Sequence, residues 1–276
     1  MIDNKPRDVT SHSHSLAAAA VGVLGAADPA AKVRLSRRAA EAWRNGRIMA
    51  VGHAQPPDRP ARPARPKLAP PQAVPRRGIA TVKGRTALLH ALAHIELNAI
   101  DLAWDLIARA TEADLPRAFY DDWVSVAVEE AGHFALLAER LAALGAAYGD
   151  LPAHDGLWQA AEDTKHDLLA RLAVVPLVLE ARGLDVTPGM IERLTAVGDR
   201  ESVAVLEVIY RDEIGHVAIG KHWFDWLCAR DARDPSATWQ ALVRQYFKGR
   251  LKPPFNEAAR AAAGLLAEDY IPLSTG

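Results

Sequence analysis

The chain has 276 residues, half of them apolar and 24% charged, which is enough for one large domain or two modest ones with a sizeable core. Its net charge is −1 with histidines neutral, which excludes a global attraction to polyanions. Cys228 is the single cysteine, which excludes an intrachain disulfide and a thiolate metal cluster and favours a cytoplasmic location.

The N-terminal part, 1–51, is expected to hold two helices. The apolar stretch 16–27 has the length of a signal sequence, but its alanine-rich core and the acidic residues before it argue against export. It is also too short to cross a bilayer, so we expect a short buried helix. Asp28-Pro29 pairs a capping side chain with proline at the first helical position, which predicts a helix that runs through Trp43 and ends near Gly46.

Residues 52–84 form a proline-rich strap. Eight prolines between positions 56 and 75 exclude a helix or a central strand and favour an extended, polyproline-like path. From Asp58 to Arg85 the chain carries eight basic residues and one acidic residue. We favour a strap that wraps the domain and pairs with acidic helices, because no aromatic side chain is available there for base stacking. The alternative is recruitment of an anionic substrate such as tRNA.

After Gly84 the sequence shows long helical periodicity and almost no strand pattern, which predicts an all-α fold. Four long helices are expected at about 85–112, 117–145, 156–183 and 199–230, with breaks at Pro116, at 145–155 and at 183–189 around Pro188. Helices of about 28 residues span about 40 Å, the length of a ferritin-type helix. We expect a ferritin-like four-helix bundle with a crossover over 85–232, including a short helix at 189–197. Smaller helices near 235–247 and 256–267 would pack on it from a C-terminal part, 233–276.

Two copies of Glu-x-x-His occur within these helices, Glu130 with His133 and Glu213 with His216. Residues three apart share one face of an α-helix, so each pair can bind one metal ion. Either motif alone is better explained by salt bridges and a hydrogen-bonded core histidine. Two copies inside apolar-striped helices favour a dinuclear site.

Such a site needs one further carboxylate on each of the other two helices, and Glu96 and Glu180 occupy apolar faces of those helices. Glu96 precedes Glu130 by 34 residues and Glu180 precedes Glu213 by 33, so the chain reads as two matched helix pairs. The longer link of 50 residues from Glu130 to Glu180 is expected of the crossover in a ferritin-like bundle.

The donor set predicts the metal. Four glutamates and two divalent ions make a neutral cluster, and carboxylates with imidazoles suit iron or manganese. We expect two Fe, with two Mn as the alternative. The metal ligands predicted are Glu96, Glu130, His133, Glu180, Glu213 and His216.

Several neighbouring residues have weaker assignments. Glu129 and Asp212 each precede a motif glutamate and are expected to accept a hydrogen bond from the histidine of the opposite helix, the alternative being a solvated salt bridge. Tyr210, one turn before Glu213, is a candidate catalytic residue near the metals, although a core tyrosine is the commoner case. His90 and His94 are expected at the surface or an interface, and not as ligands.

The sequence resembles a known family, the ferritin-like proteins catalogued as domain of unknown function 455. The resemblance is nearly full-length and rests on the segments 89–96, 129–134, 152–158, 180–188 and 212–217. It implies a di-iron ferritin-like fold without a settled reaction. A more distant similarity is to the di-iron tRNA hydroxylase that acts on methylthio-isopentenyl-adenosine and uses the same ligand set, but ligand motifs alone do not carry that substrate across.

From the site we expect an oxidoreductase that activates dioxygen to hydroxylate or oxidise an organic substrate, with an external electron donor. Three alternatives stay open: a ferroxidase that handles iron, a dimanganese catalase-like enzyme, and a non-catalytic binding module. No membrane association is expected. The sequence leaves the substrate, the electron donor and the oligomeric state unassigned.

Overall fold

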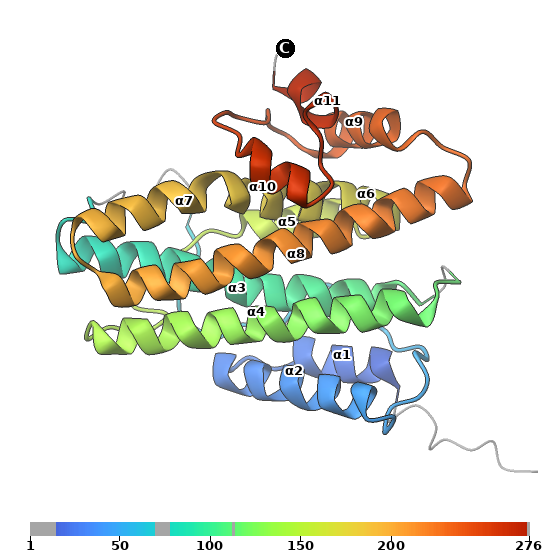
Figure 1. Cartoon of the computed structure of the whole chain (residues 1–276). Coiled ribbons are helices and arrows are strands. Elements are labelled where there is room, and N and C mark those ends of the chain that lie inside the picture. The colour runs from blue at the N-terminus through green and yellow to red at the C-terminus, as the bar shows by residue number, and fades with distance from the viewer. Residues whose placement is uncertain (1–14, 70–77, 112–113, 275–276) are drawn as a thin grey trace, which may run out of the picture. The chain divides into compact units, whose positions relative to one another are not determined.

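The computed structural model describes residues 15–69, 78–111 and 114–274, and these residues confirm the predicted all-α class (Figure 1). Within this part of the chain the only β-type pairing is one isolated bridge, between Leu68 and Ala153. The chain divides into two compact units, Met1–Pro63 with Ile100–Ala131, and Ala64–Ala99 with Gly132–Gly276.

Two long helices contribute residues to both units: α3 (Val82–Arg109) and α4 (Arg117–Ala143). Their lengths, 28 and 27 residues, agree with the sequence prediction. At about 1.5 Å per residue each extends about 40 Å. Each long helix therefore presents side chains along about 40 Å of its length.

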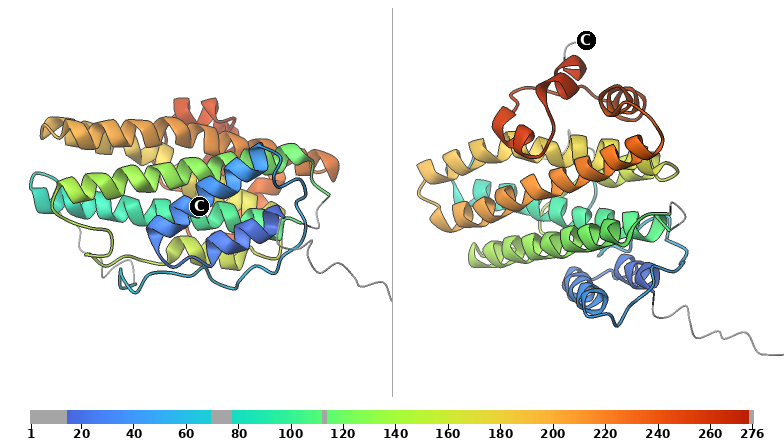
Figure 2. Two further views of the ribbon diagram at one scale, coloured as in Figure 1. Left: turned by 90° about the horizontal axis from the view of Figure 1, so that it is seen from below. Right: turned by 45° about the vertical axis from the view of Figure 1, so that its right-hand side comes forward.

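The first unit contains α1 (Leu16–Leu24) and α2 (Pro29–Arg44), which lie side by side (Figure 2). Asp28 Oδ2 accepts a hydrogen bond from the Ala31 backbone N–H at 2.7 Å, and Pro29 occupies the first helical position. The predicted helix start is thus confirmed, as is the short buried helix at the N-terminal apolar stretch.

The strap packs on the first unit through residues 61 and 62. The Ala61 backbone N–H donates to the Leu24 carbonyl at 2.8 Å. The Arg62 guanidinium lies 3.0 Å from the carboxylate of Asp101, whose other oxygen meets Lys32. Lys32 and Asp101 are fully buried, so Arg62 adds charge to an internal ion pair. This contact fits a strap that pairs with an acidic helix. Arg76 and Arg77 lie outside the described residues.

The second unit contains the remaining helices. They are α5 (Gly156–Asp163), α6 (Leu168–Val174), the π-helix η3 (Val175–Glu180), α7 (Ala181–Ala196), α8 (Arg200–Arg230), α9 (Pro235–Tyr246), α10 (Glu257–Ala262), α11 (Ala267–Tyr270) and the 3₁₀-helix η4 (Ile271–Leu273). Helices α7 and α8 run side by side, and α9 to α11 lie over one side of α6 to α8 (Figures 1 and 2).

The predicted helix at 156–183 is wrong in one respect, because α5 and α6 are separated by residues 164–167. The buried Arg171 explains the break. Its guanidinium donates to the Ala161 carbonyl at the end of α5 and to the hydroxyl of Thr164 at 3.0 Å. A side chain from the next helix therefore satisfies the end of α5, and Asp167 caps α6 by accepting from the Leu169 N–H at 2.8 Å.

The predicted break at 183–189 is also wrong, since α7 continues through Pro188 to Ala196 and absorbs the separate short helix expected at 189–197. Proline in a helix interior removes one hydrogen bond and crowds the preceding turn. Leu184, Thr187 and Leu194 are buried along α7, which packs on α8. Their burial, with roughly 1.5–3 kcal/mol for a fully buried leucine, offsets the local cost.

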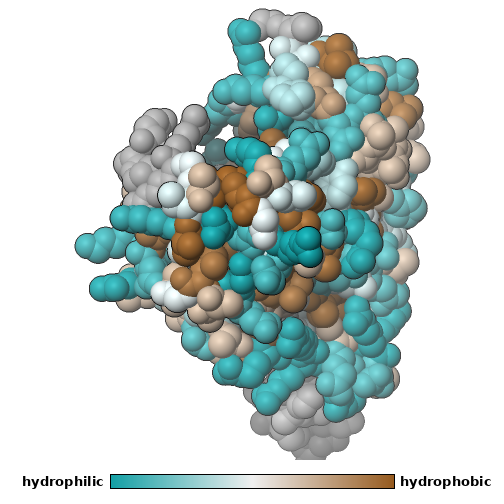
Figure 3. Space-filling model, turned by 60° about the vertical axis from the view of Figure 1, so that its left-hand side comes forward, coloured by the Kyte–Doolittle hydropathy of each residue, from teal (hydrophilic) through white to brown (hydrophobic). Residues whose placement is uncertain are grey.

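On the surface of the described residues, large apolar side chains are exposed singly and do not form one continuous patch. Met49 is 80% exposed, and Leu68, Val82 and Leu266 are about half exposed. Figure 3 shows one face, on which hydrophobic residues stand among hydrophilic ones. None of the described helices combines the length and the apolar character needed to cross a membrane.

The start of α8 is held by Asp199, which is 5% exposed. Its carboxylate accepts from the Ser202 backbone N–H at 3.1 Å and lies 2.7 Å from Arg140 and 2.9 Å from Arg85. Burial by itself raises the pKa of Asp199, but the hydrogen bonds from Ser202 and Arg140 outweigh it and hold the pKa below its usual value. Arg85, at the end of the basic strap, therefore forms an ion pair with a buried carboxylate.

We predict that Asp199→Asn lowers the free energy of unfolding at pH 7 by about 1–3 kcal/mol, because two arginines lose their shared anion. A depressed folded-state pKa stabilises the protein above the ordinary aspartate value of about 3.9. This stability is lost as the pH falls through the folded-state pKa, so wild type and variant should converge in acid. Urea unfolding across pH measures the difference. Asp234→Asn, at the exposed cap of α9, is the matched control and should cost less. A loss that persists unchanged in acid would contradict this assignment.

Candidate metal centre

The two Glu-x-x-His motifs lie on α4 and α8, inside the long helices predicted for them. His133 on α4 is 2% exposed and His216 on α8 is fully buried, and their ring centroids are 5.7 Å apart. Helices from distant parts of the sequence therefore bring two imidazoles together in the interior of the second unit.

Carboxylates face these imidazoles from two helices. Glu96 of α3, 3% exposed, places Oε2 3.3 Å from Nδ1 of His133. Glu213 of α8 places Oε1 3.6 Å from Nδ1 of His216. Glu96, His133 and Glu213 each offer a ligand atom within 4.8 Å of the others. Three oxygen or nitrogen donors from three helices at this spacing fit a metal ion that prefers carboxylate and imidazole ligands.

Glu130 is completely buried on α4, three residues before His133. Because α4 is continuous through this stretch, the two side chains occupy the same face of the helix. A fully buried carboxylate is costly unless it is paired or coordinated. The position of Glu130 on its helix is thus the one that the Glu-x-x-His pattern predicted.

Glu180 is the last residue of the π-helix η3 and is half-buried. It is not among the residues whose ligand atoms lie within 4.8 Å of one another, and neither is His216. The sequence pattern predicts an ordinary helix at Glu180, so the π-turn differs from that prediction. Such turns are rare and are frequent at functional sites. The available sequence signal was Pro176 inside an otherwise apolar helical segment.

Helix α8 approaches the π-helix closely at Gly220. A Cβ atom at this position would lie 2.4 Å from Cβ of Pro176 and 2.6 Å from its Cγ. Only glycine allows this packing without displacement, so Gly220 fixes the distance between α8 and the turn that ends at Glu180. No local sequence pattern indicates this role for Gly220.

Asp212 lies beside the histidine of the opposite helix. Its Oδ2 is 3.3 Å from Nε2 of His133, and its Oδ1 accepts from Arg211 at 3.0 Å. Burial raises the pKa of Asp212, but the hydrogen bonds from Arg211 and His133 more than compensate and lower it. The His133 ring therefore has Nε2 toward Asp212 and Nδ1 toward Glu96, which is the orientation expected when a carboxylate positions a metal-binding imidazole. Glu129, the other residue expected in this role, is exposed on α4.

Within the described residues, Tyr210 donates no hydrogen bond to the predicted metal ligands. Its hydroxyl accepts a hydrogen bond at 2.8 Å from the side chain of Asn256, the residue before α10. His90 and His94 were expected at the surface or an interface; both are buried, so the surface alternative is wrong. Nε2 of His90 accepts from the Gly149 N–H at 2.9 Å, and Nδ1 of His94 lies 2.8 Å from the Tyr148 hydroxyl. Both histidines hold the loop between α4 and α5, and that accounts for their burial.

Comparisons with known proteins place the chain in a family without assigning it an activity. A family model described as "Protein of unknown function (DUF455)" matches residues 25–271. A protein from Haemophilus influenzae described as "Uncharacterized protein" is 44% identical over 207 residues, 73% of this chain and 72% of that protein. No solved structure gives a significant match.

We predict that Gly220→Ala lowers the melting temperature, because the added methyl group forces Pro176 and α8 apart. Overpacking of this kind typically costs about 1–3 kcal/mol. Gly183→Ala on α7 is the matched control, since a Cβ there meets no atom within 4 Å and alanine favours a helix interior. Thermal unfolding followed by circular dichroism should show a loss for the first variant and none for the second. Equal melting of both variants would contradict a tight contact at Gly220.

A second prediction concerns Asp212. Asp212→Asn should preserve the fold but weaken metal affinity or turnover about 10–100-fold, because His133 loses the carboxylate that orients its ring. Glu129→Gln is the control, because Glu129 precedes the first Glu-x-x-His motif as Asp212 precedes the second. Its exposed side chain should leave affinity unchanged, and metal titration of both variants measures this. A loss of equal size in Glu129→Gln would restore the symmetrical arrangement predicted from the sequence, whereas no loss in Asp212→Asn would remove its orienting role.

Proposed function

We propose that this chain, which belongs to the DUF455 family of proteins of unknown function, is a ferritin-like protein that binds two metal ions. The observation that carries the proposal is the convergence of Glu96, His133 and Glu213 from three helices to within 4.8 Å. The ligands in this proposal are Glu96, Glu130 and His133 for one ion and Glu180, Glu213 and His216 for the other.

The arrangement of the helices supports the ferritin-like assignment. In such bundles, two helices each provide a Glu-x-x-His pair and the other two each provide a glutamate. Here α4 and α8 carry the pairs, α3 carries Glu96, and the helical run from α6 to α7 carries Glu180. The longer connection between the second and third of these helices takes the place of the crossover.

The electrostatics of the cluster support a pair of divalent cations. Glu96 and Glu130 are almost wholly removed from solvent, where a carboxylate charge is costly unless a partner or a metal ion compensates it. Two divalent ions would neutralise the charge of the four glutamates. Cys228 is buried elsewhere on α8 and burial raises its pKa to about 11, so thiolate ligation is not favoured. Oxygen and imidazole donors favour iron, with manganese as the alternative.

When bound, two iron ions supply dioxygen activation, which we propose is used to hydroxylate or oxidise an organic substrate with electrons from an external donor. The residues of this chain set the conditions for that chemistry. Asp212 holds the His133 ring and fixes its tautomer. The burial of Glu96, His133 and His216 keeps bulk water from the donor atoms and strengthens their electrostatic interactions.

Metal analysis of the protein purified in air tests the proposal. We expect about two iron ions per chain, as in dinuclear carboxylate bundles. Glu213→Ala should remove most of the metal, and Glu207→Ala, an exposed residue of the same helix, should retain it. Removal of metal should also lower the melting temperature at neutral pH, because the buried carboxylates then repel one another. Full metal occupancy in Glu213→Ala would overturn the ligand assignment.

The proposed activity needs a separate readout, namely dioxygen consumption by the reduced protein with candidate organic substrates. Consumption coupled to substrate oxidation is the expected result. Dioxygen consumed only in proportion to added ferrous ion would indicate a ferroxidase. Manganese content with rapid breakdown of peroxide would indicate a catalase-like enzyme. Partner binding that survives loss of the metal, without any turnover, would indicate a binding module. Each of these three outcomes would overturn the oxidoreductase assignment.

A further inference from the structure

A pocket of about 250 Å³ lies in the second unit, between the π-helix and the segment that links α9 to α10. One wall is apolar. It comprises Val178 and Leu179 of the π-helix together with Phe247, Leu251 and Phe255 of the linking segment. Because Leu179 directly precedes Glu180, this wall belongs to the same helical turn as a candidate metal ligand.

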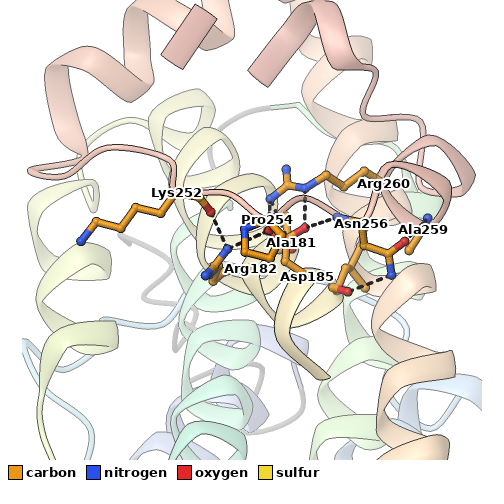
Figure 4. Close-up of polar contacts among 9 residues, drawn as sticks. Ala181, Arg182, Asp185, Lys252, Pro254, Asn256, Ala259 and Arg260 are labelled. Carbon is orange, nitrogen blue, oxygen red and sulfur yellow. Dashed lines mark hydrogen bonds and ion pairs between the residues drawn. The ribbon is translucent and has the colours of Figure 1, made fainter. Parts of the chain in front are cut away.

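The rest of the lining is cationic. It includes Arg182, Arg250, Lys252 and Arg260, with Asp185 as the acidic member. The negative charge of Asp185 is compensated within the protein. Its oxygens accept from Nε and Nη2 of Arg260 at 2.8 and 2.7 Å, and Arg182 lies 3.3 Å away (Figure 4). The pocket therefore keeps an excess of positive charge.

Two of these cations remain available to a ligand. Among the described residues, no ion pair is found for Arg250 or Lys252, and both are exposed. In Figure 4 the side chain of Lys252 extends away from the network around Asp185, while its carbonyl accepts from Arg182. Positive charges at the mouth of an apolar pocket attract an anion, and the attraction is strongest at low salt.

Arg260 supplies a third, internal group. It is 2% exposed, and its Nη1 has no hydrogen-bond acceptor among the described residues. The guanidinium carbon lies 5.0 Å from the ring centroid of Phe255 and 4.7 Å from that of Tyr270. Because Arg260 lines the pocket, its guanidinium adds to the positive charge that a bound carboxylate would meet.

We propose that this pocket binds a small amphipathic carboxylate, with the carboxylate toward Arg250, Lys252 and Arg260 and the hydrocarbon chain along the Leu179 wall. The volume limits the size of the ligand. Pockets for drug-sized molecules hold roughly 300–1,000 Å³, so a smaller pocket suits a ligand of about ten non-hydrogen atoms, such as octanoate. The inference goes beyond the proposed metal chemistry and does not depend on it.

Calorimetric titration of the full-length protein with octanoate tests the proposal. We expect one site with a dissociation constant on the order of 0.1–1 mM, as the number of ligand atoms allows. Acetate lacks the chain and 1-octanol lacks the charge, so both should bind at least about tenfold more weakly. No octanoate binding, or equal binding of octanoate and 1-octanol, would overturn the proposal.

Variants connect the binding to this pocket. The double variant Arg250→Gln/Lys252→Gln should weaken octanoate binding about three- to tenfold at low salt, and less at high salt. Lys248→Gln is the matched control, because Lys248 lies on the same segment but pairs with Asp163 at 3.1 Å and does not line the pocket. Leu179→Trp, which fills the apolar end, should abolish binding while the melting temperature stays the same. Unchanged affinity in both pocket variants would overturn the assignment.

The same titration on Glu213→Ala separates this inference from the proposed function. We expect octanoate to bind that variant with the affinity of the wild type, since no pocket residue is changed. Binding that persists without metal would support the pocket even if the oxidoreductase assignment fails. Binding lost together with the metal would show that the pocket is not an independent site, contrary to the proposal.

Discussion

The need to balance the charge of each carboxylate placed inside long helices governs this structure. Burial of an ion costs several kcal/mol unless a partner compensates it. Asp101 meets Lys32 in the first unit, and in the second unit Asp185 meets Arg260. These pairs tie segments distant in sequence to one another, so the internal acids specify which segments pack together.

The cluster around His133 solves the same problem with a different kind of partner. Glu96 and Glu213 face imidazoles, whose charge depends on protonation and therefore on what else binds there. An arginine would neutralise these carboxylates permanently and block their coordination. Histidine leaves these carboxylates able to coordinate the metal ions proposed above. The contrast between Asp185 with its arginine and Glu96 with its histidine separates carboxylates that hold the fold from those suited to a metal site.

The sequence predicts the structure correctly where a feature depends only on neighbouring residues of the chain. The Asp28-Pro29 start of α2 depends on one capping side chain and one fixed backbone angle, and it could be predicted directly. The spacing of Glu213 and His216 on one helical face is equally local. The path of α7 through Pro188 could not be predicted in this way, because burial along its length outweighs a strong local breaker. The burial of His90 depends on a loop some sixty residues further along the chain, which no helical pattern reveals.

The π-helix is where the two inferred sites meet, and its position follows from non-local packing. Pro176 lies against Gly220, so α8 can approach only if that position carries no side chain. An α-helix turns about 100° per residue, and the wider π-turn therefore changes the direction of the side chains that follow it. Leu179 lines the cationic pocket, and the next residue, Glu180, is a candidate ligand. One short turn therefore directs one residue to the pocket and holds the next as a candidate ligand, although the two inferred sites are separate.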